Sequence, residues 1–570
     1  MTNSKRIGYQ SGSSVDNNVI QYLEQHNRDY PDRVALRWVK AGAVSQWDGK
    51  AASALPHDEI NYREFTSRIR HFAGGLKKIG VEKGERVIIF LPMGVDMYTA
   101  MFAVQRIGAI AVFLDSWARS HHLGASAKCV EPKAMISSDR AFQIVAQVKE
   151  FESMPHKVVW GPGEGYSHKF SEILACPDEA PIEAVESETT ALITFTTGSS
   201  GTPKGANRTH RFLSAQHEAL SKVVPYVEGD IDMPAFPIFS LNNLASGVTT
   251  LLPGLDLAAP SERDSAILAS QIISEKVNCA TLSPAMLVGL SQYAIKENIK
   301  FPGLMRVATG GAPISKDDVQ HFYTVAPQSA LWILYGSTEV EPMAHIEGHE
   351  MLAEGPHIAD KEVLEEGVNV GDVSEDLEFK FIKINKEPID FSKTSWEALE
   401  VNQGEVGEFI VSGDHVCEGY YNNEEASFKS KIRDNQKRIW HRTGDLAYID
   451  NDKKLWIVGR VHNVIQRAGK AHFPVRAEVL LKRMDAVEQA AFLGLEDSKL
   501  GEKTTVAVKL KSGTDLAKFK NEAQRIFVKN KIPVDEFYAV SSIPMDPRHH
   551  SKVEYGVLKE LLLKGEGQKL

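Results

Sequence analysis

The sequence predicts an α/β fold in which a large N-terminal domain precedes a small α+β domain. Three observations support this fold class. Helical and strand patterns alternate through the first third of the 570 residues. Short half-exposed strand patterns replace them between 370 and 460, and a compact strand–helix pattern follows to the end. We therefore expect layered, mostly parallel sheets with helices, then a small antiparallel subdomain, then a small α+β C-terminal domain.

In the first third, apolar residues recur at helical spacing over 62–79 and 97–107. Compact apolar runs between and after them predict buried strands at 86–91, 110–114, 133–137 and 157–160. Strands that alternate with helices in this way favour a parallel sheet covered on both faces.

Further along, the runs 378–384 and 408–411 alternate polar and apolar residues, as half-exposed strands do. A last strand of this kind is expected at 454–458. From there the pattern is strand–helix–strand–strand–helix–strand–helix, an ordinary length for one domain. We divide the chain into a polar segment 1–17, an N-terminal domain 18–458, a hinge 459–463 and a C-terminal domain 464–570.

Charge is spread unevenly along the chain. The net charge is −10, but residues 463–570 carry 19 Lys and Arg against 14 Asp and Glu. This basic segment is either a module that meets an anionic ligand or only a solvated basic face. A dense Lys/Arg stripe with interleaved aromatic residues is missing from the sequence, so we expect no nucleic-acid partner.

The cysteines and apolar runs indicate the compartment. The four cysteines, Cys129, Cys176, Cys279 and Cys417, form no C-x-x-C pair, which predicts neither a zinc site nor a disulfide framework. The first 18 residues lack a signal-peptide core. The most apolar run, 99–114, is too short to span a bilayer. We expect a cytoplasmic protein with no integral membrane segment. Peripheral membrane contact stays open, and the sequence does not predict the oligomeric state.

The segment 194–210 carries the strongest functional signal. Gly198 and Gly201 allow the backbone to fold tightly and to turn N–H groups toward an anion. Hydroxyl groups and the Lys204 ammonium add further donors, so the loop can wrap a polyphosphate. A Walker A loop is excluded, because Pro203 and Gly205 flank the lysine where glycine and Ser or Thr would be required. The alternative is a flexible surface loop.

Four later segments suit the remaining parts of a nucleotide. Residues 309–313 are small and kinked, so a flat base could lie against the backbone. Glu339, in the run Tyr-Gly-Ser-Thr-Glu, could hold Mg²⁺. Asp445 could accept from ribose hydroxyls, and Lys552 lies on a C-terminal loop. Each segment alone is more often a turn or a solvated side chain.

Together, in this order and spacing, the five segments resemble the acyl-adenylate-forming superfamily of acyl-CoA synthetases, peptide-synthetase adenylation domains and luciferases. The resemblance covers roughly residues 18–565. It implies that Thr197 and the loop through Lys204 grip the β- and γ-phosphates of ATP, and that Lys552 bridges the substrate carboxylate and the α-phosphate. The other loop residues that it assigns to ATP are Thr196, Gly198, Ser199, Ser200, Gly201 and Thr202.

The resemblance also assigns the rest of the nucleotide. Gly311, Ala312 and Tyr335 would flank the adenine, with Gly336 in the same site, and Thr338 would touch the α-phosphate. The expected Mg²⁺ ligands are Glu339 and Thr197, and the expected ribose-binding pair is Asp445 and Arg460. In this family a carboxylate oxygen attacks the α-phosphorus, pyrophosphate leaves, and the C-terminal domain, which is mobile, then swings about its hinge.

The chain departs from the family pattern at several positions. The hinge position appears as His462, Ser240 stands where many members have histidine, and Gln466 stands where lysine is usual. Lys552 follows Arg548-His549-His550-Ser551 without the common glycine. These differences weaken a CoA-ligase interpretation.

Some motifs resemble the β-lactone synthetases of olefin biosynthesis, which adenylate a 2-alkyl-3-hydroxy fatty acid and need no CoA. These motifs are Phe-Pro-Ile-Phe-Ser-Leu at 236–241, Tyr-Gly-Ser-Thr-Glu-Val-Glu-Pro at 335–342, Trp-His-Arg at 440–442 and Pro-x-Asp-x-Arg-His-x-x-Lys at 544–552. Three functions are thus open. They are a fatty-acyl-CoA ligase, a β-lactone synthetase and, more remotely, a non-catalytic nucleotide-binding protein.

Several side chains keep two interpretations. His549 or His550 could accept a substrate hydroxyl proton, or these residues and Arg548 could serve loop hydrogen bonding or phosphate contact. His210 could contact substrate or phosphate, or simply begin a helix. We expect the acyl pocket to draw on residues 239–248, 283–287 and 310–312, which favour an apolar carboxylic acid as substrate.

Overall fold

The computed structural model describes residues 10–114, 120–197, 203–256, 261, 263–353, 367–545 and 553–570. The chain forms two compact units. Unit 1 comprises Met1–His349 and Gly413–Lys429, and unit 2 comprises Glu350–Ser412 and Ser430–Leu570. The predicted hinge at 459–463 lies within unit 2 and stays a prediction.

The first sheet of unit 1 has the strand order β7-β6-β5-β3-β4-β8-β9. All neighbours are parallel except β8 and β9, so the predicted parallel sheet is confirmed. Its strands are β3 (Arg86–Phe90), β4 (Ile110–Phe113), β5 (Ala134–Ser138), β6 (His156–Trp160), β7 (His168–Lys169), β8 (Thr190–Thr197) and β9 (Pro203–Thr209).

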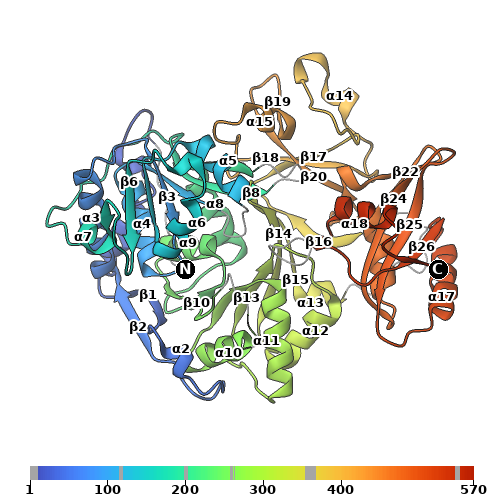
Figure 1. The fold of residues 1–570 in the computed structure, drawn as a ribbon, viewed down its shortest axis with the longest axis horizontal. Coiled ribbons are helices and arrows are strands. Elements are labelled where there is room, and N and C mark those ends of the chain that lie inside the picture. The colour runs from blue at the N-terminus through green and yellow to red at the C-terminus, as the bar shows by residue number, and fades with distance from the viewer. Residues whose placement is uncertain are drawn as a thin grey trace. The chain divides into compact units, whose positions relative to one another are not determined.

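Helices cover both faces of this sheet, because successive strand residues point to opposite sides. Val87 and Ile89 of β3 pack in one core with α3 (Tyr62–Lys78) and α4 (Val95–Arg106). Ile88, between them, packs in another core with α5 (Ser120–Val130) and α6 (Asp139–Val145). Figure 1 shows these helices beside the strands.

The second sheet of unit 1 runs β15-β14-β13-β12-β10-β11-β1-β2, with antiparallel pairs at its two ends and parallel pairs between them. Its strands are β1 (Val34–Val39), β2 (His57–Asn61), β10 (Ile231–Pro234), β11 (Thr249–Leu251), β12 (Cys279–Leu282), β13 (Arg306–Gly310), β14 (Ala330–Ser337) and β15 (Val340–Glu347).

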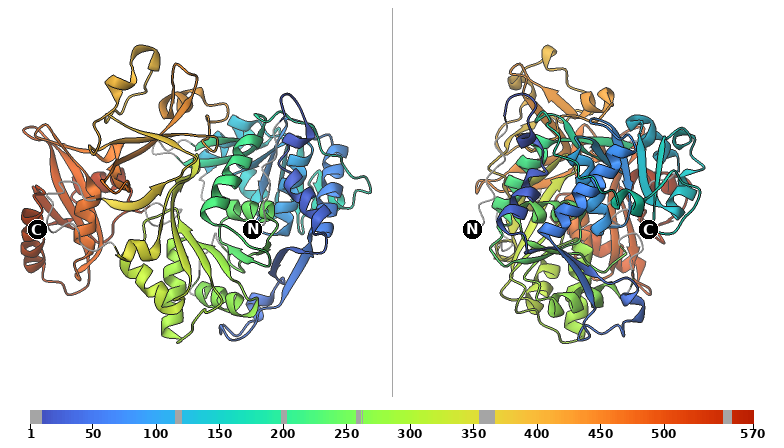
Figure 2. Two further views of the ribbon diagram at one scale, coloured as in Figure 1. Left: turned by 180° about the vertical axis from the view of Figure 1, so that it is seen from behind. Right: turned by 90° about the vertical axis from the view of Figure 1, so that its left-hand side faces the viewer.

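Helices pack against this second sheet, and the left view of Figure 2 shows this part of the chain from behind. The longer ones are α1 (Gln21–Asp29), α8 (His210–Val223), α9 (Pro237–Ser246), α10 (Asp264–Ser274), α11 (Pro284–Lys296) and α12 (Lys316–Val325). Short helices among the described residues include α2 (Ala43–Gln46), α7 (Phe170–Leu174), α13 (Gly348–Ala353), α14 (Trp396–Leu399) and α15 (Glu424–Ser430).

Unit 2 begins with the antiparallel strands that the sequence predicts. Their order is β17-β18-β20-β21-β16, with β19 paired to β20. The strands are β16 (Val368–Val373), β17 (Glu378–Ile382), β18 (Gly407–Ser412), β19 (Lys431–Arg433), β20 (Ile439–Ile449) and β21 (Leu455–Arg460).

The rest of unit 2 is a sheet of order β23-β22-β25-β26-β27, with β24 paired to β25. Its two faces bury alternate residues of β24, Phe492 against α16 and α17 and Leu493 against α18. The elements are β22 (Ile465–Arg467), β23 (Lys470–His472), α16 (Pro474–Lys482), β24 (Val487–Asp497), β25 (Gly501–Leu510), α17 (Leu516–Lys529), β26 (Glu536–Ala539), α18 (Tyr555–Leu563) and β27 (Gln568–Lys569).

The mixed α/β fold class is therefore confirmed, and the C-terminal pattern is correct apart from the short strands β23 and β27. Within the described ranges, no helix is long and apolar enough to cross a bilayer.

Candidate active site

The strands that flank the predicted phosphate loop (residues 198–202) are β8 and β9, and they are antiparallel. In the register of β8 and β9, Thr196 pairs with Lys204 and Thr197 with Pro203, so the two ends of the loop are held together. The chain continues as a strand after the loop, and α8 begins only at His210. The structure describes the backbone alone for Thr196 and Thr197. Five predicted loop residues lie outside the described ranges, namely Gly198, Ser199, Ser200, Gly201 and Thr202.

Glu339 lies in the tight turn between β14 and β15. Ser337 and Val340 pair across the hairpin, which leaves Thr338 and Glu339 as its two turn residues. The Glu339 N–H donates to Ser337 Oγ at 3.3 Å. At Gly336, just before the turn, a Cβ would lie 3.1 Å from Glu341 Cγ, so this position suits a residue without a side chain. Tyr335, half-buried on β14, precedes it.

A buried arginine donates a hydrogen bond to the backbone of this turn. Arg208 on β9 is only 4% exposed, and its Nη2 donates to the Thr338 carbonyl oxygen at 2.8 Å. Burial lowers the pKa of Arg208, and the nearby carboxylates of Glu341 and Glu339 oppose that shift. Arg208 therefore links the exit strand of the phosphate loop to the turn that carries Thr338 and Glu339.

Tyr420 contacts the two charged groups that the sequence assigns to phosphate and metal. Its hydroxyl donates to Glu339 Oε1 at 2.7 Å, and the Lys204 ammonium lies 5.5 Å from the centre of its ring. Sequence reasoning assigned no role to Tyr420 or Arg208. Their contacts join segments more than 75 residues apart in the chain, and local pattern carries no such signal.

The predicted adenine-flanking residues come from adjacent strands. Gly310, at the end of β13, pairs with Leu334 of β14, immediately before Tyr335. A Cβ at Gly310 would lie 2.6 Å from the Leu334 carbonyl oxygen, and Gly311 has a φ of +85°, so both positions require glycine. Ala312 follows them, half-buried. The structure thus brings Gly311 and Tyr335 to neighbouring strand ends.

The predicted ribose pair lies in unit 2. Asp445 of β20 and Arg460 of β21 are register partners, and Arg460 Nε lies 2.7 Å from Asp445 Oδ1. The Asp445 N–H also donates to Thr443 Oγ1 at 3.0 Å. Between Thr443 and Asp445, Gly444 has a φ of +70°, a left-handed conformation that turns the strand at this point.

Some candidates lie elsewhere or outside the described ranges. Lys552 and residues 548–550 are outside them, and the flanking segments are tied by a bridge between Met545 and Val553. His210 is the first residue of α8, as the helix-start interpretation requires. It is buried, its Nδ1 accepts from the Val19 N–H at 3.2 Å, and burial lowers its pKa to about 3.

Three of the positions that depart from the family pattern, Ser240, His462 and Gln466, are described, whereas residues 548–551 lie outside the described ranges. Ser240 is fully buried in α9. His462 follows β21, and burial lowers its pKa, with Arg460 adding to the shift. Gln466 lies on β22, where its N–H donates to Glu502 Oε2 at 2.6 Å.

A small, mainly apolar pocket of about 50 Å³ lies among α1, α4, α8 and α9 of unit 1. The α9 side includes Leu241, Asn242 and Ala245, which belong to the segment expected to line the acyl pocket. Facing them on α8, His217 Nδ1 lies 2.7 Å from Asn242 Oδ1. The other expected segments, 283–287 and 310–312, do not line this pocket.

The chain is similar to known proteins in sequence and in fold. The AMP-binding enzyme family matches residues 23–421. An olefin β-lactone synthetase of Stenotrophomonas maltophilia is 28% identical over 551 residues, which cover 94% of this chain and 96% of that protein. A 4-coumarate–CoA ligase of Oryza sativa is 23% identical, over 86% of this chain and 85% of that protein.

Solved structures share the fold. The o-succinylbenzoate CoA synthetase of Bacillus subtilis, in complex with its acyl-adenylate, aligns with a TM-score of 0.73 at 20% identity, over 94% of this chain and 97% of that one. ATP-bound MatB of Rhodopseudomonas palustris aligns with a TM-score of 0.74 at 20% identity, over 95% and 98% of the two chains. Because the family match spans most of the chain, this protein belongs to the AMP-binding enzyme family and is an AMP-forming ligase.

Proposed function

We propose that this ligase activates a fatty-acid-like carboxylate as an acyl-AMP, and that the substrate's own 3-hydroxyl then displaces AMP to close a β-lactone. In the first step a carboxylate oxygen attacks the α-phosphorus of ATP, and the bond to the β-phosphate oxygen breaks. In the second step the hydroxyl oxygen attacks the acyl carbon, AMP leaves with the electron pair, and the hydroxyl proton passes to a base.

One observation carries the first half-reaction. Lys204 and Glu339, the cation and the carboxylate expected to serve the triphosphate and its Mg²⁺, both contact Tyr420 within unit 1. Mg²⁺ prefers carboxylate and hydroxyl oxygens, so Glu339, with Thr197 as a second oxygen ligand, suits that ion. When bound, Mg²⁺ would neutralise phosphate charge and polarise the bond that breaks. Because the reaction consumes ATP, we expect it to occur in the cytoplasm.

We assign the other nucleotide contacts to the residues that the sequence predicts. Thr196, Lys204 and the loop at 198–202 would bind the phosphates, and Thr338 the α-phosphate. Gly311, Ala312, Tyr335 and Gly336 would flank the adenine, while Asp445 and Arg460 would bind the ribose. Lys552 would bridge the carboxylate and the α-phosphate, and the domain beyond the hinge at 459–463 would carry it.

The pocket of unit 1 supports an apolar acyl group. Its volume is only about 50 Å³, so the support comes from its lining, most of which is aliphatic or aromatic. A carboxylate with a long hydrocarbon portion would gain about 25 cal/mol for each Å² of apolar surface removed from water. Polar amino acids would gain far less binding free energy from contact with this apolar lining.

Two features support ring closure as the second step. Olefin β-lactone synthetases of Stenotrophomonas maltophilia and Xanthomonas campestris are 28% and 25% identical over 94% of this chain. The positions at which many CoA ligases have histidine and lysine are Ser240 and Gln466 here. Transfer to CoA is the competing second step, since 4-coumarate–CoA ligases also match much of the chain.

The test is to incubate the enzyme with ATP, Mg²⁺ and a 2-alkyl-3-hydroxy fatty acid, with and without CoA. We expect pyrophosphate release and a product that mass spectrometry shows to be the acid less one water, independent of CoA. A 2-alkyl fatty acid without the hydroxyl is the matched control, and we expect it to stop at the acyl-AMP. Turnover that requires CoA and yields a thioester would contradict ring closure while retaining adenylation.

A further inference from the structure

Tyr420 lies far from Glu339 and Lys204 in the sequence, yet it contacts both side chains. The tyrosine is 8% exposed, so its hydroxyl is largely removed from water and needs a hydrogen-bond partner. Glu339 Oε1 supplies that partner at 2.7 Å. The flat face of the same ring lies 5.5 Å from the Lys204 Nζ, within the range of a cation–π contact.

The backbone fixes Tyr420 on the phosphate-loop side. Tyr420 bridges to Ala206 of β9, and the Tyr421 N–H donates to the Gly205 carbonyl oxygen at 2.8 Å. On the other side, the Tyr420 N–H donates to Ser427 Oγ at 2.8 Å. The Tyr420 ring is therefore carried by a segment that pairs with β9, the strand that follows the phosphate loop.

The same segment is tied to the turn that carries Glu339. Val416 bridges to Val340, and the Cys417 N–H donates to the Glu339 carbonyl oxygen at 2.8 Å. Residues 416–421, which we call the brace, thus pair with β9 at one end and with the start of β15 at the other. All of these contacts lie within unit 1.

We propose that Tyr420 is a positioning residue of the nucleotide site, whose hydroxyl orients the Glu339 carboxylate for a divalent cation and whose ring holds the Lys204 ammonium for phosphate. This inference rests on the proposed adenylation function. A phenolic donor keeps one carboxylate oxygen in a fixed direction without neutralising its charge, so the carboxylate can still ligate a cation. Partners of this kind typically change metal affinity or activity 10- to 100-fold when they are removed.

The two contacts can be separated by substitution. Tyr420→Phe removes the hydroxyl and keeps the ring, whereas Tyr420→Leu removes both. Tyr166→Phe is the matched control, because the Tyr166 hydroxyl donates to Asp139 Oδ1 at 2.6 Å, a bond of the same kind on another part of unit 1. Thermal unfolding and circular dichroism of each full-length variant establish that it is folded.

The experiment measures Mn²⁺ binding by electron paramagnetic resonance, with the non-hydrolysable α,β-methylene analogue of ATP present. We expect Tyr420→Phe to raise the Mn²⁺ dissociation constant by about 10-fold and Tyr166→Phe to leave it unchanged. In EDTA, Tyr420→Leu should bind the metal-free analogue roughly 2- to 5-fold more weakly, because a cation–π contact of that strength is lost. Tyr420→Phe should bind it like the wild type.

A second arm excludes a general structural effect. In the Glu339→Gln background, Tyr420→Phe should change Mn²⁺ binding less than 2-fold, because the carboxylate that it orients is gone. An undiminished effect there, or Mn²⁺ binding by Tyr420→Phe equal to the wild type, would overturn the positioning role. Failure of the wild-type protein to bind the analogue at all would instead refute the proposed adenylation function.

Discussion

Asp445 and Arg460 face each other in direct register on β20 and β21, with Arg460 Nε 2.7 Å from Asp445 Oδ1. The carboxylate side chain is 8% exposed and the guanidinium side chain 41% exposed. The buried Asp445 carboxylate therefore orients the solvent-exposed guanidinium of Arg460. A carboxylate held in this way is a preformed acceptor for a pair of vicinal hydroxyls, as a ribose would present.

Asp445→Asn should weaken ATP binding. The amide keeps the size of the side chain but loses the charge and one acceptor, and hydrogen bonds to charged groups contribute about 1.5–3 kcal/mol. We expect the KM for ATP to rise by about 10- to 100-fold, with the KM for the acid unchanged. Steady-state pyrophosphate assays over a range of ATP concentrations measure both constants.

The matched control for that change is Asp372→Asn, which alters an exposed carboxylate paired with Lys454 at 2.9 Å in the same unit. It should leave both constants as they are. Equal KM values for ATP in Asp445→Asn and the wild type would remove Asp445 from the nucleotide site.

Asp232 makes the stability of unit 1 depend on pH. The carboxylate is buried on β10, where it accepts from Asn243 Nδ2 at 2.5 Å. Burial is the main cause that raises the pKa of Asp232 to about 7. Between the unfolded value, about 4, and 7, the folded protein binds a proton that the unfolded chain releases, so stability falls as pH rises through that window and is level above it.

Asp232→Asn should abolish this pH dependence. The amide can still accept from Asn243, and it carries no charge to desolvate. From pH 4 to 7 the variant should gain stability on the wild type, by at most about 4 kcal/mol for a shift of this size. Urea denaturation at a series of pH values measures the gain, and Asp317→Asn, at the exposed start of α12, is the control. A difference in unfolding free energy between Asp232→Asn and the wild type that stays constant with pH would show that Asp232 is charged in the folded protein.

Local pattern predicted several of the elements but not the contacts between them. The apolar run that predicts a strand at 86–91 is β3 (Arg86–Phe90), and the helical spacing at 62–79 is α3 (Tyr62–Lys78). Each of those signals lies within one element. The return strand β9 was not predicted, because Pro203-Lys204-Gly205 resembles a loop exit. Its polar residues are strand-forming only because β8 and the brace pair with its two edges.

The candidate site shows the same limit. Glu339 and Asp445 could be proposed from the motifs in which they stand, and Arg460 from the family resemblance. The role of Arg208 could not be predicted, since an arginine at a strand position is ordinarily solvent-exposed, and only the fold reveals that it is buried beneath the carbonyl of Thr338. His210 was open between two interpretations until burial and the Val19 contact favoured a structural one.

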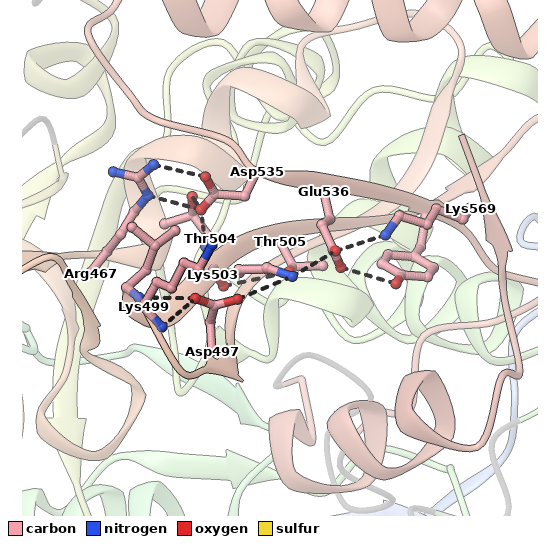
Figure 3. Close-up of polar contacts among 11 residues, drawn as sticks. Arg467, Asp497, Lys499, Lys503, Thr504, Thr505, Asp535, Glu536 and Lys569 are labelled. Atoms are coloured by element: carbon pink, nitrogen blue, oxygen red, sulfur yellow. Dashed lines mark hydrogen bonds and ion pairs between the residues drawn. The ribbon is translucent and has the colours of Figure 1, made fainter.

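Asp535 stabilises the C-terminal sheet through the network drawn in Figure 3. Arg467 donates to both of its oxygens, at 2.7 and 2.8 Å, and the Thr504 N–H donates to Oδ2 at 2.9 Å. The hydrogen bond from Arg467 is the main cause that lowers the pKa of Asp535 to about 2. The stability that this group supplies is complete above the unfolded pKa, near 4, and is lost as pH falls toward 2.

Asp535→Asn should therefore cost about 1–2 kcal/mol at pH 7 and much less near pH 2, where the wild-type carboxylate is itself becoming protonated. Hydrogen exchange of β25 amides in the full-length protein measures the loss at pH 7, and melting temperatures measure its decline with acid. Glu488→Gln, which alters a surface pair with Lys509, should cost under about 1 kcal/mol. An equal cost at both pH values would mean that Asp535 acts through shape and not charge.

Lys552→Ala should abolish most acid-dependent pyrophosphate release. A carboxylate and an α-phosphate that approach to about 4 Å repel each other by roughly 4 kcal/mol at an effective dielectric constant of 20, and a lysine between them offsets that term. Removing one such transition-state contact typically costs 10²–10³ in rate, so we expect a fall of at least about 100-fold with ATP binding retained. Lys559→Ala, on α18 with a distant partner in Glu502 at 3.7 Å, is the control and should turn over like the wild type.

Lys552→Arg separates charge from shape, because the planar guanidinium keeps the charge but cannot serve as a compact point donor. A partial recovery in that variant would indicate an electrostatic role, and unchanged turnover in Lys552→Ala would remove this lysine from the mechanism.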